Sequence, residues 1–291
     1  MYGKLKLFKA AKNNDLESIK DLVEQEVNLH ADNDEALRLA AVNGHLEVVK
    51  YLVEQGADLH ADDEALRLAA SNGHLEGVKY LLEQGANLHS QNDLALRCAA
   101  AYGQLRIVKY LLGQRADLHP YDDRALRWAA GKGHLEVVKY LLEQGANLEA
   151  VNDCALESAS RNGHLEVVKY LVERGANLHA YDDWVLQRAA ENGHLEVVKY
   201  LLERGADSDR LSEKILIEVF TSYDLQIEKI TPRLSSLLLK INLVKKPCQA
   251  STRKEIVSTY KKKIVSSLVI LMYHLYYRPS GPGFFQAIEQ V

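Results

Sequence analysis

The chain repeats itself with a period of about 30 residues, and this feature constrains its fold more than any other. The motif Asn-Gly-His-Leu-Glu-Val-Val-Lys-Tyr-Leu begins at Asn43 and returns, whole or lightly altered, along the first two thirds of the sequence. Its glycine stands at Gly44, Gly73, Gly103, Gly133, Gly163 and Gly193. Periods of roughly 20 to 50 residues are typical of solenoids, in which each unit packs against its neighbours. The period therefore predicts an extended array that binds at a surface rather than an enzyme with an enclosed pocket.

The unit from Asn33 to Asp62 predicts two antiparallel helices joined by a short turn. Asp34 is expected to cap the first helix, because a carboxylate at the N-cap accepts hydrogen bonds from the free backbone N–H groups of the first turn. Gly44 ends this helix, and Gly56 supplies the left-handed residue after the second. The apolar positions expected to face inward are Leu37, Ala40, Ala41, Leu46, Val48, Val49, Leu52 and Val53.

The run from Ala36 to Leu52 reads Ala-Leu-Arg-Leu-Ala-Ala-Val-Asn-Gly-His-Leu-Glu-Val-Val-Lys-Tyr-Leu and is followed by Gly56-Ala57-Asp58. This pattern resembles an ankyrin repeat, which usually has about 33 residues and carries Thr-Pro-Leu-His at its first helix. Here Glu35-Ala36-Leu37-Arg38 stands in the place of that tetrapeptide. The resemblance implies an all-α ankyrin-repeat solenoid of stacked antiparallel helix pairs, with fingers shorter than those usual in the family.

The 30-residue period with Asp-x-Ala-Leu-Arg is also similar to the large ankyrin families of giant viruses of the mimivirus type. The closing segment, residues 277–283, is similar to tails found in those proteins. This resemblance implies a viral protein that acts in the cytoplasm of a host cell.

The array is predicted to occupy residues 1–230 as eight units, of which six are regular and two are atypical. The atypical units are expected around residues 7–16 and 216–225, where counting one period beyond the regular glycines places them. Residues 231–291 break the period and form a tail with two predicted helical stretches, 234–244 and 255–277. The tail carries ten Lys or Arg residues against two Glu, although the whole chain has a formal charge of -4.

Three roles remain open for this tail. Its apolar faces are expected to seal the open end of the solenoid, since a terminal unit needs a polar outer face. Alternatively, its basic surface contacts nucleic acid, or the tail recruits cellular machinery such as a ubiquitin ligase, as the F-box-like segments of some viral ankyrin proteins do. Residues 231–237 match an F-box poorly, and no known nucleic-acid motif is present.

Composition predicts a soluble, intracellular and cytoplasmic protein, and we expect a monomer. The spacings of Cys98, Cys154 and Cys248 match neither a disulfide framework nor a zinc site. The N-terminus lacks a signal-peptide core. The longest apolar stretch, 264–277, is shorter than the roughly 20 residues that cross a bilayer, so no membrane is expected as a partner.

The expected partner is a protein, and nucleic acid is the less favoured one. Recognition must depend on positions where the units differ, because the framework is constant. In the ankyrin family the fingers and first helices line a concave groove, and binding hot spots favour aromatic residues and Arg. The predicted partner-binding residues are Tyr102, Tyr121, Arg124, Trp128, Lys132, Tyr181 and Trp184. The alternative for Trp128 and Trp184 is that they fill gaps between adjacent helices.

The remaining recurrent residues predict structural roles. Arg38, Arg67, Arg97 and Arg127 form a ladder that could grip an acidic ligand, although hydrogen bonds to the fingers or ion pairs with nearby Asp residues explain it better. The recurrent histidines lie about one unit apart, which is too far for a shared metal ion. No catalytic motif is present, so we expect no catalytic residues, no cofactor and no metal.

Overall fold

A computed structural model describes residues 2–61, 63–150, 154–179 and 184–207, together with residues 211, 212 and 215, but not the side chains of residues 121 and 122. One compact unit covers residues 1–211 and a second begins at residue 212. The predicted last repeat, the division at residue 230 and the helices of the tail lie outside the described residues.

Fourteen helices follow one another in the described part of the chain, and they form seven pairs. The first helices of the pairs are α1 (Tyr2–Lys12), α3 (Glu35–Asn43), α5 (Glu64–Ser71), α7 (Leu94–Ala101), α9 (Pro120–Gly131), α11 (Cys154–Arg161) and α13 (Trp184–Glu191). The second helices are α2 (Leu16–Glu24), α4 (Leu46–Glu54), α6 (Leu75–Glu83), α8 (Leu105–Gly113), α10 (Leu135–Glu143), α12 (Leu165–Glu173) and α14 (Leu195–Glu203). The predicted all-α fold of stacked helix pairs is confirmed.

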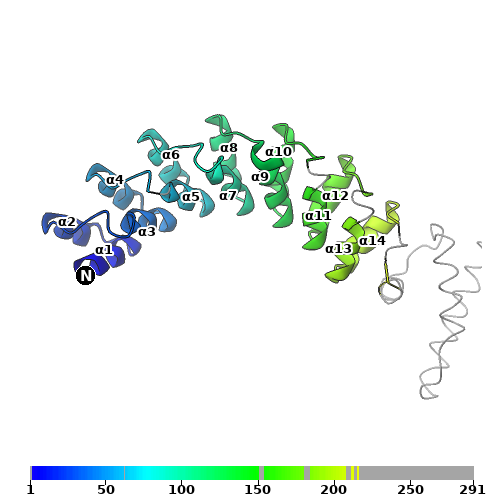
Figure 1. The fold of residues 1–291 in the computed structure, drawn as a ribbon, viewed down its shortest axis with the longest axis horizontal. Helices are drawn as coiled ribbons and strands as arrows, with labels where there is room; N and C mark the ends of the chain where they lie inside the picture. Colours follow the sequence, from blue (N-terminus) through cyan, green and yellow to red (C-terminus); the bar gives the residue numbers. More distant parts are fainter. Residues whose placement is uncertain are drawn as a thin grey trace, which may run out of the picture. The chain divides into compact units, whose positions relative to one another are not determined.

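Within this unit the helices form two layers (Figure 1). The odd-numbered helices lie in one row and the even-numbered helices in a second. Successive odd-numbered helices contact each other more extensively than successive even-numbered ones do. Closer packing in one layer bends the row toward that layer, so the odd-numbered helices line its inner face.

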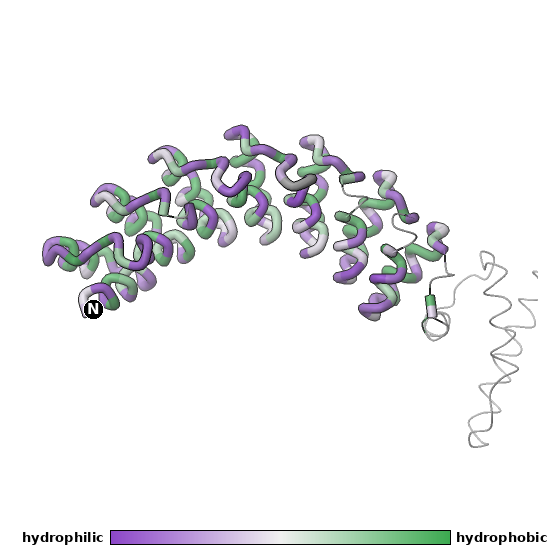
Figure 2. The backbone as a smooth tube through the Cα atoms, viewed as in Figure 1, coloured by the Kyte–Doolittle hydropathy of each residue, from purple (hydrophilic) through white to green (hydrophobic). Residues whose placement is uncertain are grey.

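The core runs between the two layers, where apolar positions of both helices meet (Figure 2). In the second pair, Val48, Val49 and Leu52 are buried, whereas Leu46 and Val53 are only half-buried, so the inward face is narrower than predicted. Alanines fill the corresponding positions of the first helices, and Ala40 is fully buried. Small side chains let neighbouring odd-numbered helices approach closely, which explains the tighter contacts of that layer.

The predicted capping role of Asp34 is wrong. Its backbone is left-handed at φ 55°, and its side chain accepts no hydrogen bond from the helix that follows. The buried carboxylate instead accepts from the backbone N–H of Asp58, 3.0 Å away in the next finger, and contacts His30 Nδ1 at 3.1 Å. Asp93 repeats the arrangement by accepting from the N–H of Asp117 at 3.1 Å. These carboxylates therefore connect successive fingers instead of capping helices.

The histidine that opens five of the seven described second helices has a structural role, as predicted. Its Nε2–H donates to a backbone carbonyl of the preceding unit, close to the end of that unit's first helix. The pairs are His45 with Lys12 (2.9 Å), His74 with Val42 (3.0 Å), His134 with Ala101 (3.0 Å), His164 with Gly131 (3.0 Å) and His194 with Arg161 (2.9 Å). In the fourth pair Gln104 replaces the histidine, and its Nε2 donates to Ser71 at 3.2 Å. One side-chain hydrogen bond thus links each of these units to the one before it.

His164 gives this link a pH dependence. Burial lowers the pKa of its imidazole by more than the hydrogen bond to Gly131 raises it, and the neighbouring His134, His194 and Lys132 add to the lowering. The unfolded chain therefore binds a proton more readily than the folded chain, so the contribution of this histidine to stability is present above its ordinary pKa and is lost as the pH falls. We expect His164→Gln to keep the hydrogen bond, as Gln104 does, and to remove this dependence. Urea unfolding at about pH 7.5 and about pH 5.5 should show a smaller acid-induced loss of stability in the variant than in the wild type. An equal loss in both would contradict the assignment.

Candidate partner-binding surface

The structure separates the predicted partner-binding residues into two groups. Arg124, Trp128 and Trp184 lie on first helices, in the layer that forms the inner face. Tyr102 and Lys132 follow the last residues of α7 and α9, where the chain turns into the second helix. An eight-residue helix is about 12 Å long, so these two lie roughly one helix length from the finger end. Trp184, at the start of α13, is therefore at the finger end, whereas Tyr102 and Lys132 are at the turn end.

Trp128 is half-buried between two guanidinium groups. The Cζ atom of Arg97, one unit earlier, lies 5.5 Å from the centre of its ring, and that of Arg124 lies 5.9 Å away. Arg97 is itself buried and donates to the finger carbonyls of Gln91 (2.5 Å) and Asn92 (3.1 Å). Trp128 therefore contributes to the contact between neighbouring units, which is the gap-filling alternative, while part of its ring remains accessible.

Trp184 is different, because 43% of its surface is exposed. It is the first residue of α13, and the Arg188 guanidinium lies 4.5 Å from the centre of its ring. A cation over an aromatic face attracts the ring and restricts its rotation. The ring is therefore already ordered before a partner binds. Trp184 is thus a pre-positioned aromatic side chain at the inner face.

The side chains of the two finger tyrosines, Tyr121 and Tyr181, are not described. Tyr121 belongs to the first turn of α9, but only its backbone is described. Tyr181 lies outside the described residues. Their predicted contribution to the surface stays a prediction.

The arginine ladder binds fingers, as predicted, but its acidic partners are glutamates rather than aspartates. Arg38 donates to the backbone carbonyl of Asp32 at 2.9 Å and to Glu64 at 2.6 Å, and it also pairs with Glu35. Arg67 donates to Glu64 at 2.8 Å. The two hydrogen bonds from these arginines lower the pKa of the Glu64 carboxyl and keep it ionised. These guanidinium groups are occupied within the array.

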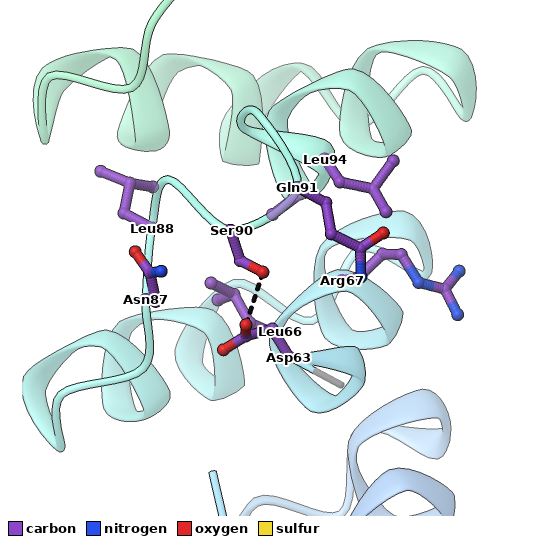
Figure 3. A pocket seen from close by; sticks show the side chains of 9 residues that line it. Asp63, Leu66, Arg67, Asn87, Leu88, Ser90, Gln91 and Leu94 are labelled. Carbon is purple, nitrogen blue, oxygen red and sulfur yellow. Dashed lines mark hydrogen bonds between the residues drawn. The ribbon is translucent and has the colours of Figure 1, made fainter. Parts of the chain in front are cut away.

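A pocket lies between α5 and the finger that leads to α7 (Figure 3). Ser90 Oγ donates across it to the Asp63 carboxylate at 2.5 Å, and Leu66, Asn87 and Leu94 contribute to its walls. Its cavity volume is about 10 Å³, about the space of one water molecule, so it is too small for a small-molecule ligand. The hydrogen bond from Ser90 to Asp63 crosses the pocket, so it joins this finger to the unit before it.

Sequence reasoning missed one feature of the second helices. Their second residue is Glu in six of the seven described pairs, and Arg106 takes this place in α8. The repeat itself carries the signal, because Arg106 is the one exception at a position that is otherwise Glu in the described pairs. This substitution changes the surroundings of the lysine three residues later.

The described residues show neither a metal site nor a membrane span. Among them no group of three or more His, Cys, Asp or Glu side chains is arranged to hold a metal ion. In the same part of the chain, no helix has the length and apolar character needed to cross a membrane.

Comparisons with known proteins agree with this architecture. The family model described as "Ankyrin repeats (3 copies)" matches residues 7–92, 96–182 and 153–212. Among solved structures, the chain is similar to the human protein in "Crystal structure of human ASB11 ankyrin repeat domain", with 27% identity and a TM-score of 0.59. That similarity covers 69% of this chain and 98% of the other. No curated protein sequence matches the chain.

Proposed function

Because this chain belongs to the ankyrin repeat family, whose domains generally mediate protein–protein interactions, we propose that it is a non-enzymatic scaffold that binds a protein partner on its inner face. The observation that carries the proposal is Trp184. Trp184 is 43% exposed and is held by a stacked Arg188, and Trp and Arg are residue types that are enriched in binding hot spots. We therefore propose that affinity concentrates around the first helices of the fifth and seventh pairs.

The other residues of the surface support Trp184 in different ways. Arg124 and the accessible part of Trp128 offer a second cation and aromatic pair on the same layer. Tyr121 and Tyr181 extend the surface along the fingers in this proposal. Tyr102 and Lys132 follow the last residues of α7 and α9, where the chain turns into the second helix, and we assign them to a separate part of the binding surface.

The test is a binding measurement with a matched control. A partner captured from nuclease-treated lysate would be identified by mass spectrometry, produced separately and titrated against variants of the full chain. We expect Trp184→Ser to weaken its binding by tenfold or more, since loss of a hot spot removes about 2 kcal/mol. Tyr51→Ser removes a half-buried aromatic ring from α4, in the outer layer, and should leave the affinity unchanged. Equal weakening by both variants would contradict the inner-face site.

A second candidate function rests on the charge of residues 231–291, where ten Lys or Arg residues face two Glu. Such a tail would recruit further machinery, for example a ubiquitin ligase, or contact nucleic acid. Deletion of the tail distinguishes the alternatives. A partner that is lost only with this deletion would assign the function to the tail, and association with RNA that falls steeply with salt would assign it to nucleic acid.

We also propose that the array belongs to the viral type of 30-residue repeats and acts in the cytoplasm of a host cell. This proposal is supported by the period and by the Asp-x-Ala-Leu-Arg pattern, in which Leu-Arg replaces the usual Leu-His. A partner found among the cytoplasmic proteins of a host would support it, whereas a secreted or nuclear partner would not.

A further inference from the structure

A basic and aromatic patch interrupts the regular surface where α7 turns into α8. In five of the other pairs, the Glu at the start of the second helix binds a Lys three residues later. The pairs are Glu17–Lys20 (2.8 Å), Glu47–Lys50 (2.9 Å), Glu76–Lys79 (2.8 Å), Glu136–Lys139 (2.7 Å) and Glu166–Lys169 (2.7 Å). Because these hydrogen bonds favour the charged amine, they raise the pKa of Lys50 and of Lys139. These lysines are therefore satisfied by the array itself.

Arg106 changes this arrangement in α8. Lys109, three residues later, has a cation instead of a carboxylate beside it, and it is exposed where the corresponding lysines of the other described pairs are only half-exposed. Its nearest described contact is with the ring of Tyr140, 5.1 Å from the ring centre. No Asp or Glu occurs anywhere in residues 94–116. Within the described residues, neither Arg106 nor Lys109 forms an ion pair.

The turn beside this helix departs from the pattern as well. Four other units have an asparagine here whose side chain donates back to its own helix, as Asn72 does to Leu68 at 2.9 Å and Asn162 to Ser158 at 2.8 Å. Tyr102 stands in this place in the fourth pair and is 63% exposed, and Lys132, also exposed, stands there in the fifth. Helices of neighbouring units lie roughly 8–10 Å apart, so these side chains share one edge of the array.

These departures are unfavourable for the isolated array. A cation in the first turn opposes the helix dipole, and two cations three residues apart on a helix repel each other. Replacing an asparagine that closes its own helix by an exposed tyrosine also gives up a hydrogen bond. Local rules that are broken together, without a compensating contact in the fold, are expected where a surface serves binding. Bound carboxylates would offset both charge effects.

We infer that Tyr102, Arg106, Lys109 and Lys132 form a second docking site, which takes a short acidic peptide segment of a protein partner. Charge complementarity selects the acidic peptide, and Tyr102 provides the apolar contact beside the cations. An extended polyanion such as RNA fits less well, because the rest of residues 1–230 carries an excess of acidic residues that would repel it. The site lies at the turn end of the helices, whereas Trp184, the residue that carries the inner-face proposal, opens α13 at the finger end.

The test uses the full chain and a poly-L-glutamate peptide. Zero-length carbodiimide coupling joins peptide carboxylates to nearby lysines, and mass spectrometry maps the joined positions. We expect Lys109 and Lys132 to be coupled more readily than Lys79 and Lys139, which are already paired with glutamates. Coupling to the lysines of residues 231–291 serves as an internal reference, because the tail is basic and its sequence stays unchanged in every variant.

The decisive variant is Tyr102→Asn combined with Arg106→Glu, which restores the residues found in most other units. We expect coupling at Lys132, which this variant leaves in place, to fall about fivefold relative to the tail. The stability of the variant should equal or exceed that of the wild type, since the restored residues agree with the helix dipole and the turn. A loss of coupling through misfolding is thereby excluded by the same experiment.

Two comparisons make the result specific. Arg115→Gly removes a cation at the opposite end of α8, where other units have glycine, and should leave the coupling at Lys132 unchanged. Trp184→Ser should also leave it unchanged, so failure of this site and failure of the inner-face site are distinguishable. The inference would be overturned if the variant of Tyr102 and Arg106 couples as the wild type does. It would also be overturned if single-stranded RNA displaces the peptide from Lys132 at lower concentration than free peptide does.

Discussion

Replacing Leu111 by alanine is expected to cost about 3 kcal/mol of unfolding free energy, within the ~2–5 kcal/mol range of such substitutions in cores. Leu111 lies in α8 at the middle of the described array and is completely buried. Truncation removes apolar contacts and leaves a cavity, because helices held by neighbours on both sides close only partly around it. Urea unfolding followed by circular dichroism gives this difference directly.

Leu112 provides a matched control for that substitution. It has the same side chain and the same helix, but it is only half-buried. We expect Leu112→Ala to lower the unfolding free energy clearly less, by about 1 kcal/mol, since the Leu112 side chain buries less apolar surface than Leu111 does. Equal costs for the two variants would show that the boundary between core and surface in α8 is misplaced.

Asp93→Ala is expected to cost about 2 kcal/mol, a large effect for a residue beside a turn. Its carboxylate is buried, accepts from the backbone N–H of Asp117 at 3.1 Å and contacts His89 Nδ1 at 3.0 Å. Removing the carboxylate leaves a backbone donor of the next finger without its acceptor. The loss of stability should therefore extend to the following unit, and its finger should become less ordered. Hydrogen exchange at the amide of Asp117 should accelerate in the variant.

Two further variants test the reason for that effect. Asp93→Asn retains an oxygen that accepts the same hydrogen bond, and it should cost less than the alanine variant. Asp21→Ala, at an exposed position of α2, should change stability by no more than about 0.5 kcal/mol. An effect of Asp93→Ala no greater than that of Asp21→Ala would contradict the role of this carboxylate in joining fingers.

The repeat pattern allowed the helices, their order and most of the core to be predicted. The spacing of apolar residues fixes which side of each helix is buried, and Gly44 adopts the expected left-handed backbone at φ 73°. The function of Asp34 could not be predicted in this way. An aspartate before a helix has a local use as a cap and a distant use as an acceptor, and only the position of the next finger decides between them.

The candidate sites were harder to predict, for a related reason. Variation between units identified Tyr102 and Trp184, which are exposed, as well as Trp128, which packs between arginines. Variation between units does not report whether a side chain projects to solvent or packs against the next unit, because that depends on how the units stack. The residues that looked like one surface in the sequence therefore lie at different places: Trp184 opens α13 at the finger end, whereas Tyr102 and Lys132 follow α7 and α9 at the turn.

The hydrogen bond from the histidine of one unit to a carbonyl of the unit before it has a consequence for how such a chain changes over time. The acceptor is a main-chain oxygen, which every amino acid provides, and Lys12, Val42, Ala101, Gly131 and Arg161 all serve. A unit therefore needs no particular side chain in its predecessor at this joint. Gene duplication, deletion or recombination that respects the 30-residue period would produce a joint that is already complete. Arrays of this kind can lengthen, shorten and reorder their units while each new surface is exposed to selection.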